Sequence, residues 1–136
     1  MYDVIYVDMV ADLFHYGHVE YLKQCKRMCN FLKVGIHNDK DVEKYKRTPV
    51  LTMEERIKVV ESCKYVDEVI PNAPIHVTPE FLKANNIQRV VHANDISLQS
   101  IQDMYGDIFN ELLFVPYTVG ISTTEIIKRV KAREDL

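Results

Sequence analysis

Five short apolar runs, separated by segments with helical periodicity, constrain the fold of this chain more than any other feature. The runs are rich in Val, Ile and Leu and do not alternate with polar residues, which is typical of parallel strands covered on both faces. We therefore predict strands at Asp3–Asp8, Leu32–His37, Glu68–Pro71, Arg89–His92 and Leu112–Pro116.

The segments between the runs have the spacing and the start signals of helices. We expect helices over residues 18–29, 52–63, 78–86 and 122–132. Thr52 with Glu55, and Ser122 with Glu125, have the spacing of a capping box, and Thr78 precedes a proline at the first helical position. Strands alternating with helices predict an α/β fold, a Rossmann-like open parallel sheet with helices on both faces.

Composition and charge narrow the class of protein. A chain of 136 residues is expected to form one domain, residues 1–136. The net charge of −3 and the lack of a basic run argue against a nucleic-acid partner, and no segment is long enough to insert into a membrane. Without a leader pattern and with three unpatterned cysteines, we expect a cytoplasmic protein in which Cys25 and Cys29 are core residues.

The loop after the first strand carries two histidines around a glycine, His15, Gly17 and His18. A helix begins there, and its free N–H groups suit a phosphate, which a glycine would let approach closely. The histidines would then donate hydrogen bonds to charge that develops on phosphate oxygens. A zinc pair, or plain capping and surface histidines, are the alternatives for this motif alone.

The loop after the last predicted strand has the same character. Gly120 precedes the hydroxyl residues Ser122, Thr123 and Thr124 at the start of a helix. One loop of this kind is compatible with simple helix capping. Two of them, each at the end of a strand, indicate a polyphosphate held between two helix N-termini.

Two further loops carry polar groups at the same edge of the sheet. Lys44, Lys46 and Arg47 form a basic cluster that is either a solvated loop or a mobile loop facing a triphosphate. The segment HANDI, residues 92–96, ends the fourth strand with polar side chains that either read a base or ligand amine, or form an Asx turn.

Taken together, these segments resemble the cytidylyltransferase family within the nucleotidyltransferases marked by H-x-G-H. DLFHYGH resembles the first signature and GISTTEII the second, and TPVLTMEERIKVVESCKYVDEVI, NAPIHVTPEFL and HANDI resemble intervening segments of the ethanolamine-phosphate and choline-phosphate enzymes. The resemblance covers nearly the whole chain in the same order.

The resemblance implies transfer of CMP from CTP to a phosphorylated small alcohol with release of pyrophosphate, and Mg²⁺ bound with the CTP. It implies catalytic roles for His15, His18 and Lys46 and no protein-held metal. Acceptor binding falls to Asp12, Ile75 and Tyr117. Nucleotide binding falls to Val10, Ala11, Gly17, His92, Asn94, Asp95, Gly120, Ile121, Ser122, Thr123 and Thr124.

The chain also departs from the family signatures. Met9 replaces a glycine, Ala11 an aromatic residue, Tyr117 an arginine and Lys64 a second arginine. Tyrosine offers one neutral hydroxyl where arginine grips a phosphate with two N–H groups. A nucleotide-binding or dimerisation module with weakened catalysis therefore stays open as an alternative.

The acceptor is expected to be ethanolamine phosphate, because HANDI is closer to the ethanolamine-type enzymes and Ile75 replaces an aromatic residue suited to choline. Choline phosphate and glycerol phosphate remain alternatives. The segment CKYVDEVI, residues 63–70, resembles the family's dimer segment and predicts a homodimer.

Overall fold

The computed structural model describes all 136 residues and contains one five-stranded parallel sheet with the strand order β3-β2-β1-β4-β5. The strands are β1 (Tyr2–Met9), β2 (Cys29–Ile36), β3 (Glu68–Ile70), β4 (Arg89–Ala93) and β5 (Leu112–Val115). All five predicted strands are present, and the α/β fold is confirmed. β2 starts three residues before its predicted start, because Cys29 pairs with Tyr2 although the next two residues are exposed.

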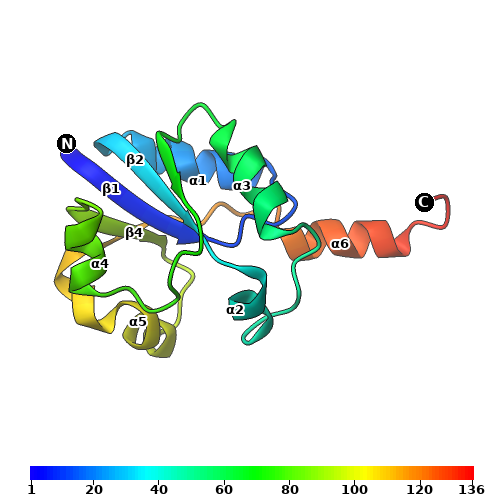
Figure 1. Cartoon of the computed structure of the whole chain (residues 1–136). Helices are drawn as coiled ribbons and strands as arrows, with labels where there is room; N and C mark the ends of the chain where they lie inside the picture. Colours follow the sequence, from blue (N-terminus) through cyan, green and yellow to red (C-terminus); the bar gives the residue numbers. More distant parts are fainter.

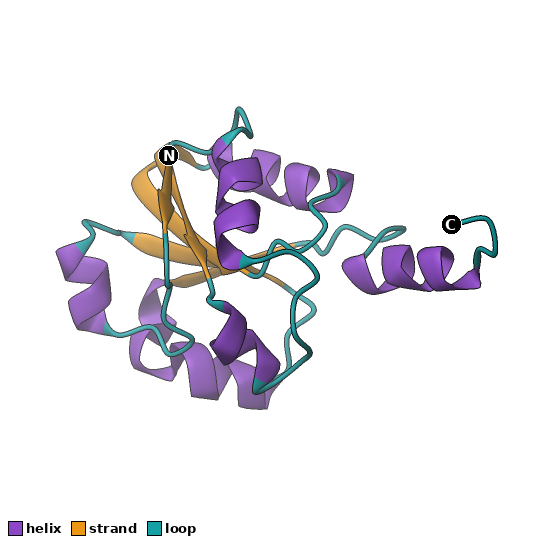
Figure 2. Cartoon of the chain, turned by 45° about the vertical axis from the view of Figure 1, so that its right-hand side comes forward, coloured by secondary structure: helices purple, strands orange, loops and turns teal.

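Helices cover both faces of the sheet (Figure 1). They are α1 (Tyr16–Lys26), α2 (Asp39–Glu43), α3 (Met53–Glu61), α4 (Pro79–Ala84), α5 (Leu98–Tyr105), the 3₁₀ helix η1 (Gly106–Glu111) and α6 (Thr123–Ala132). The four predicted helices are present, and α2, α5 and η1 are additional. α6 extends away from the rest of the molecule in both overall views (Figures 1 and 2). No helix has the length and apolar character needed to cross a membrane.

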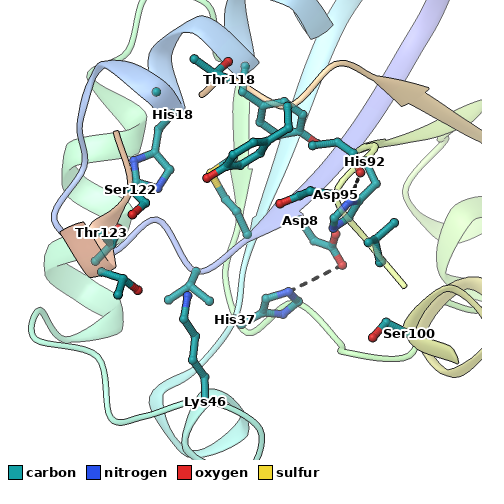
Figure 3. A pocket seen from close by; sticks show the side chains of 18 of the residues that line it. Asp8, His18, His37, Lys46, His92, Asp95, Ser100, Thr118, Ser122 and Thr123 are labelled. Atoms are coloured by element: carbon teal, nitrogen blue, oxygen red, sulfur yellow. Dashed lines mark hydrogen bonds and ion pairs between the residues drawn. The ribbon is translucent and has the colours of Figure 1, made fainter. Parts of the chain in front are cut away.

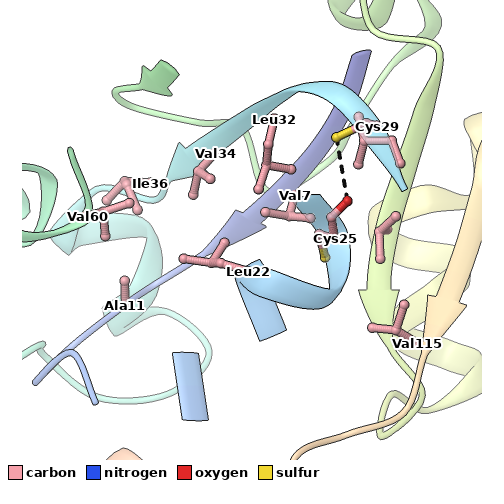
Figure 4. Close-up of a cluster of buried hydrophobic side chains, with 12 residues drawn as sticks. Val7, Ala11, Leu22, Cys25, Cys29, Leu32, Val34, Ile36, Val60 and Val115 are labelled. Atoms are coloured by element: carbon pink, nitrogen blue, oxygen red, sulfur yellow. Dashed lines mark hydrogen bonds between the residues drawn. The ribbon is translucent and has the colours of Figure 1, made fainter. Parts of the chain in front are cut away.

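Two hydrophobic clusters hold the layers together. On one face Leu22 and Cys25 of α1 and Val60 of α3 pack against the inner strands (Figure 4). On the other face Leu82 of α4 and Tyr105 of α5 pack against β1 and β4.

The two cysteines predicted to be core residues are both buried in the first of these clusters. Burial raises the pKa of the Cys25 thiol to about 12, so this thiol stays protonated and packs as an apolar group.

The strand order places a crevice at the centre of the sheet. The chain moves outward from β1 to β2 and β3, then crosses back through α4 to β4 on the other side of β1. The loops after β1 and β4 therefore diverge to opposite faces. In open α/β sheets this switch point, at the carboxyl ends of the strands, is where ligands bind.

Candidate functional site

A cavity of about 850 Å³ lies at this crevice, lined by the loops after β1, β4 and β5 and by residues of the loop after α2 (Figure 3). It brings together segments more than a hundred residues apart in the chain. The predicted site residues that line it are Val10, His15, Gly17, His18, Lys46, His92, Asp95, Tyr117, Ile121, Ser122, Thr123 and Thr124.

The two signature histidines are held by backbone N–H groups at the start of α1. The Nδ1 atom of His15 accepts a hydrogen bond from the Gly17 N–H at 3.0 Å, and the Nδ1 atom of His18 accepts one from the His15 N–H at 3.1 Å. Since each Nδ1 accepts, the proton of each neutral ring sits on Nε2. The local structure therefore caps the helix and leaves two Nε2–H donors for a ligand.

Burial and the close packing of the two rings keep both imidazoles neutral. Their centroids lie 3.9 Å apart. Burial lowers the pKa of His18 to about 4, and the nearby charges of His15 and Lys46 act in the same direction. Burial also lowers the pKa of His15. Both imidazoles are therefore neutral hydrogen-bond donors near pH 7 rather than a pair of repelling cations.

Gly17 is required by this packing. A Cβ atom at position 17 would lie 2.8 Å from Cε1 of His15 and 3.1 Å from Cγ2 of Ile121. The lack of a side chain thus makes room for the His15 ring against the loop that precedes α6. This is a structural reason for the glycine, in addition to the close phosphate approach expected from the sequence.

The start of α6 lies at the same end of the cavity as the histidines. Ser122 caps the helix by accepting from the Glu125 N–H at 3.1 Å, and the Thr123 hydroxyl donates to the Asp12 carbonyl oxygen at 2.8 Å. His18, Lys46 and the first residues of α6 line the same part of the cavity (Figure 3). Such a set of donors suits a polyphosphate.

Only one member of the basic cluster reaches the main cavity. Lys46 lines it, and burial, aided by the charge of Arg47, lowers its pKa while Asp12 opposes the shift. Lys44 is exposed and pairs with Asp41 at 3.8 Å. Arg47 lines a neighbouring cavity of about 160 Å³.

The other end of the main cavity contains a buried carboxylate that the sequence analysis did not select. Asp8 is 6% exposed, and its Oδ1 accepts a hydrogen bond from the Tyr105 hydroxyl at 2.5 Å. Its Oδ2 has no hydrogen-bond partner and lies 3.6 Å from Nε2 of His37. Asp8 and His37 stand at or just after the ends of adjacent strands, a position that could have identified them.

Five predicted residues do not line the main cavity, namely Ala11, Asp12, Ile75, Asn94 and Gly120. Asp12 differs most from expectation, because its buried carboxylate accepts the N–H groups of Val50 and Leu51 at 2.8 and 2.9 Å. These bonds hold the loop before α3, a role that was not expected for Asp12. The Asn94 side chain accepts from the Tyr117 N–H at 3.1 Å, which likewise holds two loops together.

The altered signature residues are accommodated by the backbone. Met9 ends β1 paired with Ile36, and left-handed φ angles occur instead at Ala11 (57°) and Leu13 (48°). Position 9 therefore does not need a glycine. Ala11 is buried within the larger hydrophobic cluster, so its small side chain is part of the packing.

Arg56 ties the loops around the cavity together and was not identified from the sequence. Its fully buried guanidinium donates through Nη1 to the carbonyl oxygens of Val10 (2.7 Å) and His37 (2.9 Å). Its Nε donates to the Leu51 carbonyl at 3.1 Å, and its Nη2 contacts Asp39 at 2.6 Å. One side chain thus fixes the ends of β1 and β2 and the starts of α2 and α3.

The chain is similar in sequence to known cytidylyltransferases. The ethanolamine-phosphate cytidylyltransferase of Dictyostelium discoideum is 39% identical over 129 residues, which cover 93% of this chain and 36% of that protein. The choline-phosphate cytidylyltransferase of Saccharomyces cerevisiae is 42% identical over 132 residues, 93% of this chain and 31% of that protein. The chain thus spans about a third of the length of these relatives.

A solved structure and a family description complete the comparison. The lipopolysaccharide core biosynthesis protein from Thermoplasma volcanium superposes with a TM-score of 0.68 at 18% identity, covering 85% of this chain and 96% of that one, and shares the fold. The family described as Cytidylyltransferase-like matches residues 8–129, which include both signature loops, strands β2 to β5 and the last two residues of β1. The chain therefore belongs to the Cytidylyltransferase-like family.

Proposed function

We propose that this domain transfers CMP from CTP to a phosphorylated small alcohol and releases pyrophosphate. The observation that carries the proposal is one cavity with two chemically different ends: His15, His18, Lys46 and the α6 N-terminus at one, and the unpartnered Asp8 carboxylate at the other. The names of the relatives, cytidylyltransferases for ethanolamine phosphate and choline phosphate, support it.

The donor set suits direct transfer between phosphates. An oxygen of the acceptor's phosphate attacks the α-phosphorus of CTP, a new P–O bond forms, and the bond to the β-phosphate oxygen breaks with its electron pair on pyrophosphate. The attacking oxygen is already anionic, so no general base is needed. The Nε2–H groups of His15 and His18 and the Lys46 ammonium stabilise the charge that develops on the phosphoryl oxygens.

The acceptor that fits the other end is ethanolamine phosphate. A buried carboxylate oxygen without a partner is costly unless a cation or a donor reaches it. The ammonium group of ethanolamine supplies both to Asp8. Glycerol phosphate brings hydroxyl donors without a charge, and choline phosphate brings a charge without N–H donors.

Magnesium, assembly and location are further parts of the proposal. We propose that Mg²⁺ accompanies CTP and is held by the CTP phosphates and water. We propose a homodimer formed through residues 63–70, which include the sheet-edge strand β3. We place the protein in the cytoplasm.

The test is a panel of CTP or ATP with phosphorylated ethanolamine, choline and glycerol and with aminoethylphosphonate, with pyrophosphate release as the readout. We expect CTP-dependent release with ethanolamine phosphate, and its loss in His18→Ala. His76→Ala is the matched control, because His76 is exposed and bonds Asp107 outside the cavity. Release in His18→Ala at the wild-type rate contradicts the assigned role.

A second candidate function is a nucleotide-binding or dimerisation module with weakened catalysis. The observation that favours it is Tyr117, which lines the cavity where the family signature has an arginine. Calorimetric binding of CTP with Mg²⁺, but no pyrophosphate release with any acceptor, would establish this function and exclude the first.

Light scattering at micromolar concentration tests the proposed homodimer.

A further inference from the structure

The ring of His37 has a defined orientation at the Asp8 end of the cavity. Its Nδ1 lies 3.1 Å from the carbonyl oxygen of Ala73, and a carbonyl oxygen only accepts. Nδ1 therefore carries a proton. In the neutral ring the other nitrogen, Nε2, presents a lone pair toward Asp8.

With the ring in this neutral form, two hydrogen-bond acceptors face the same space. His37 Nε2 and Asp8 Oδ2 are 3.6 Å apart, which is longer than a hydrogen bond, and both side chains are almost fully buried (Figure 3). Oδ2 has no partner, while Oδ1 is satisfied by the Tyr105 hydroxyl. Both residues line the cavity. The pair lacks a donor that reaches both atoms from the cavity.

The backbone holds His37 firmly in this position. Its N–H donates to the Met9 carbonyl at 3.2 Å, and its carbonyl accepts from Nη1 of Arg56 at 2.9 Å. With the ring bonded to Ala73 as well, the Nε2 atom of His37 is held in place before a ligand arrives. A hydrogen-bonding side chain that is already ordered loses little freedom when a ligand binds, and it discriminates more sharply between ligands.

We propose that His37, with its ring neutral, is a specificity-determining residue that makes the acceptor site select a primary ammonium over a quaternary one. A primary ammonium donates one N–H to Asp8 Oδ2 and a second to His37 Nε2. A quaternary ammonium has no N–H. It is attracted to Asp8 by charge but donates no hydrogen bond to His37. This inference rests on the proposed function, because it concerns the acceptor of the same reaction.

Two variants separate the parts of the ring. In His37→Asn the side-chain NH₂ reaches the position of Nδ1 and keeps the bond to Ala73, but no atom replaces Nε2. In His37→Gln the longer side chain carries its amide oxygen to the region of Nε2. Both variants keep a polar, neutral side chain at this buried position.

The experiment is calorimetric binding of ethanolamine phosphate and of choline phosphate to the wild-type chain and both variants, in the presence of CMP so that no reaction occurs. We expect wild type to prefer ethanolamine phosphate. His37→Asn should weaken its binding by about 10- to 100-fold, the value of a hydrogen bond to a charged group, and change choline phosphate by less than about 2-fold. His37→Gln should recover part of the loss.

Several outcomes overturn the inference. A general packing role predicts equal losses for both ligands, and a protonated His37 paired with Asp8 predicts tighter binding of both in His37→Asn. No binding of either ligand to wild type also rejects it. Pyrophosphate release, measured separately, decides the proposed function: release with choline or glycerol phosphate alone keeps cytidylyl transfer and rejects the role of His37.

Discussion

The charge state of His18 predicts a defined loss of stability in mild acid. Its pKa is about 4 in the folded protein because of burial and the neighbouring charges of His15 and Lys46, against 6.5 for an ordinary histidine. Between these values the unfolded chain binds a proton that the folded chain does not. The free energy of unfolding therefore falls as the pH drops from 7 to 5, because protonation of His18 in this range stabilises the unfolded chain and not the folded one.

The size of this loss follows from the two pKa values. Integrating the difference in bound protons between pH 7 and pH 5 gives about 2 kcal/mol from His18 alone. The test variant is His18→Asn, because Oδ1 of asparagine lies near the position of Nδ1 and can still accept the His15 N–H that caps α1. The variant keeps the cap but removes the titrating group.

The assay is urea unfolding of both proteins at pH 7 and pH 5, followed by circular dichroism. We expect the wild-type protein to lose about 2 kcal/mol more than His18→Asn over this range. The other titrating groups contribute to both proteins and largely cancel in the difference. Equal losses in the two proteins would refute the reasoning, because they would show that His18 is not held neutral by its surroundings.

His76 provides a control of opposite sign. Hydrogen bonds to Asp107 and to the Asp103 carbonyl raise the pKa of this exposed histidine. Its stabilising effect is present below the unfolded pKa and is lost as the pH rises through the folded one. His76→Asn should therefore make the acid loss of stability larger, whereas His18→Asn makes it smaller.

Three further predictions follow from the contacts of the site. Arg56→Met should lower the free energy of unfolding by about 3–5 kcal/mol in urea titrations, since it leaves three loop carbonyls without their donor. A loss below about 1 kcal/mol would contradict the role of Arg56 in holding these loops. Gly17→Ala should reduce kcat by at least about 10-fold because the new Cβ displaces the His15 ring, and unchanged kcat would show that the ring has room. Tyr117→Arg should tighten calorimetric binding of CTP about 10-fold and make it more salt-dependent, and binding unaffected by salt contradicts phosphate contact.

The sheet was predictable because parallel strands buried on both faces leave continuous apolar runs, and the helices with clear caps were predictable from Thr52, Thr78 and Ser122. The short helix α2 and the start of α5 leave weaker signals. Leu98 at the start of α5 is 86% exposed, so its apolar side chain gives no guide to the buried face of the helix.

The meeting of the histidine loop and the hydroxyl loop at one cavity was also predictable, because their donors lie in two local motifs that each begin a helix. The Asp8 end of the cavity was predictable only in part, because strand-end positions mark Asp8 and His37 as candidates but do not relate them to each other or to Tyr105. Asp8 and His37 look like the last residues of strands, and Tyr105 looks like a helix core residue. Only the fold shows that the three meet, since they come from three elements far apart in the chain and no local pattern relates them.

The role of Asp12 explains how the first loop tolerates Met9 and Ala11. Its carboxylate accepts two N–H groups from the loop before α3, and its own carbonyl accepts the Thr123 hydroxyl at the start of α6. Arg56 donates a hydrogen bond to the carbonyl oxygen of the nearby Val10. The loop is therefore positioned by bonds to two other loops and a buried guanidinium rather than by a glycine at position 9. Since none of these bonds uses the side chains of positions 9 and 11, the departures from the signature there remove no hydrogen bond that positions the loop before His15 and His18, which supports the proposed transfer activity.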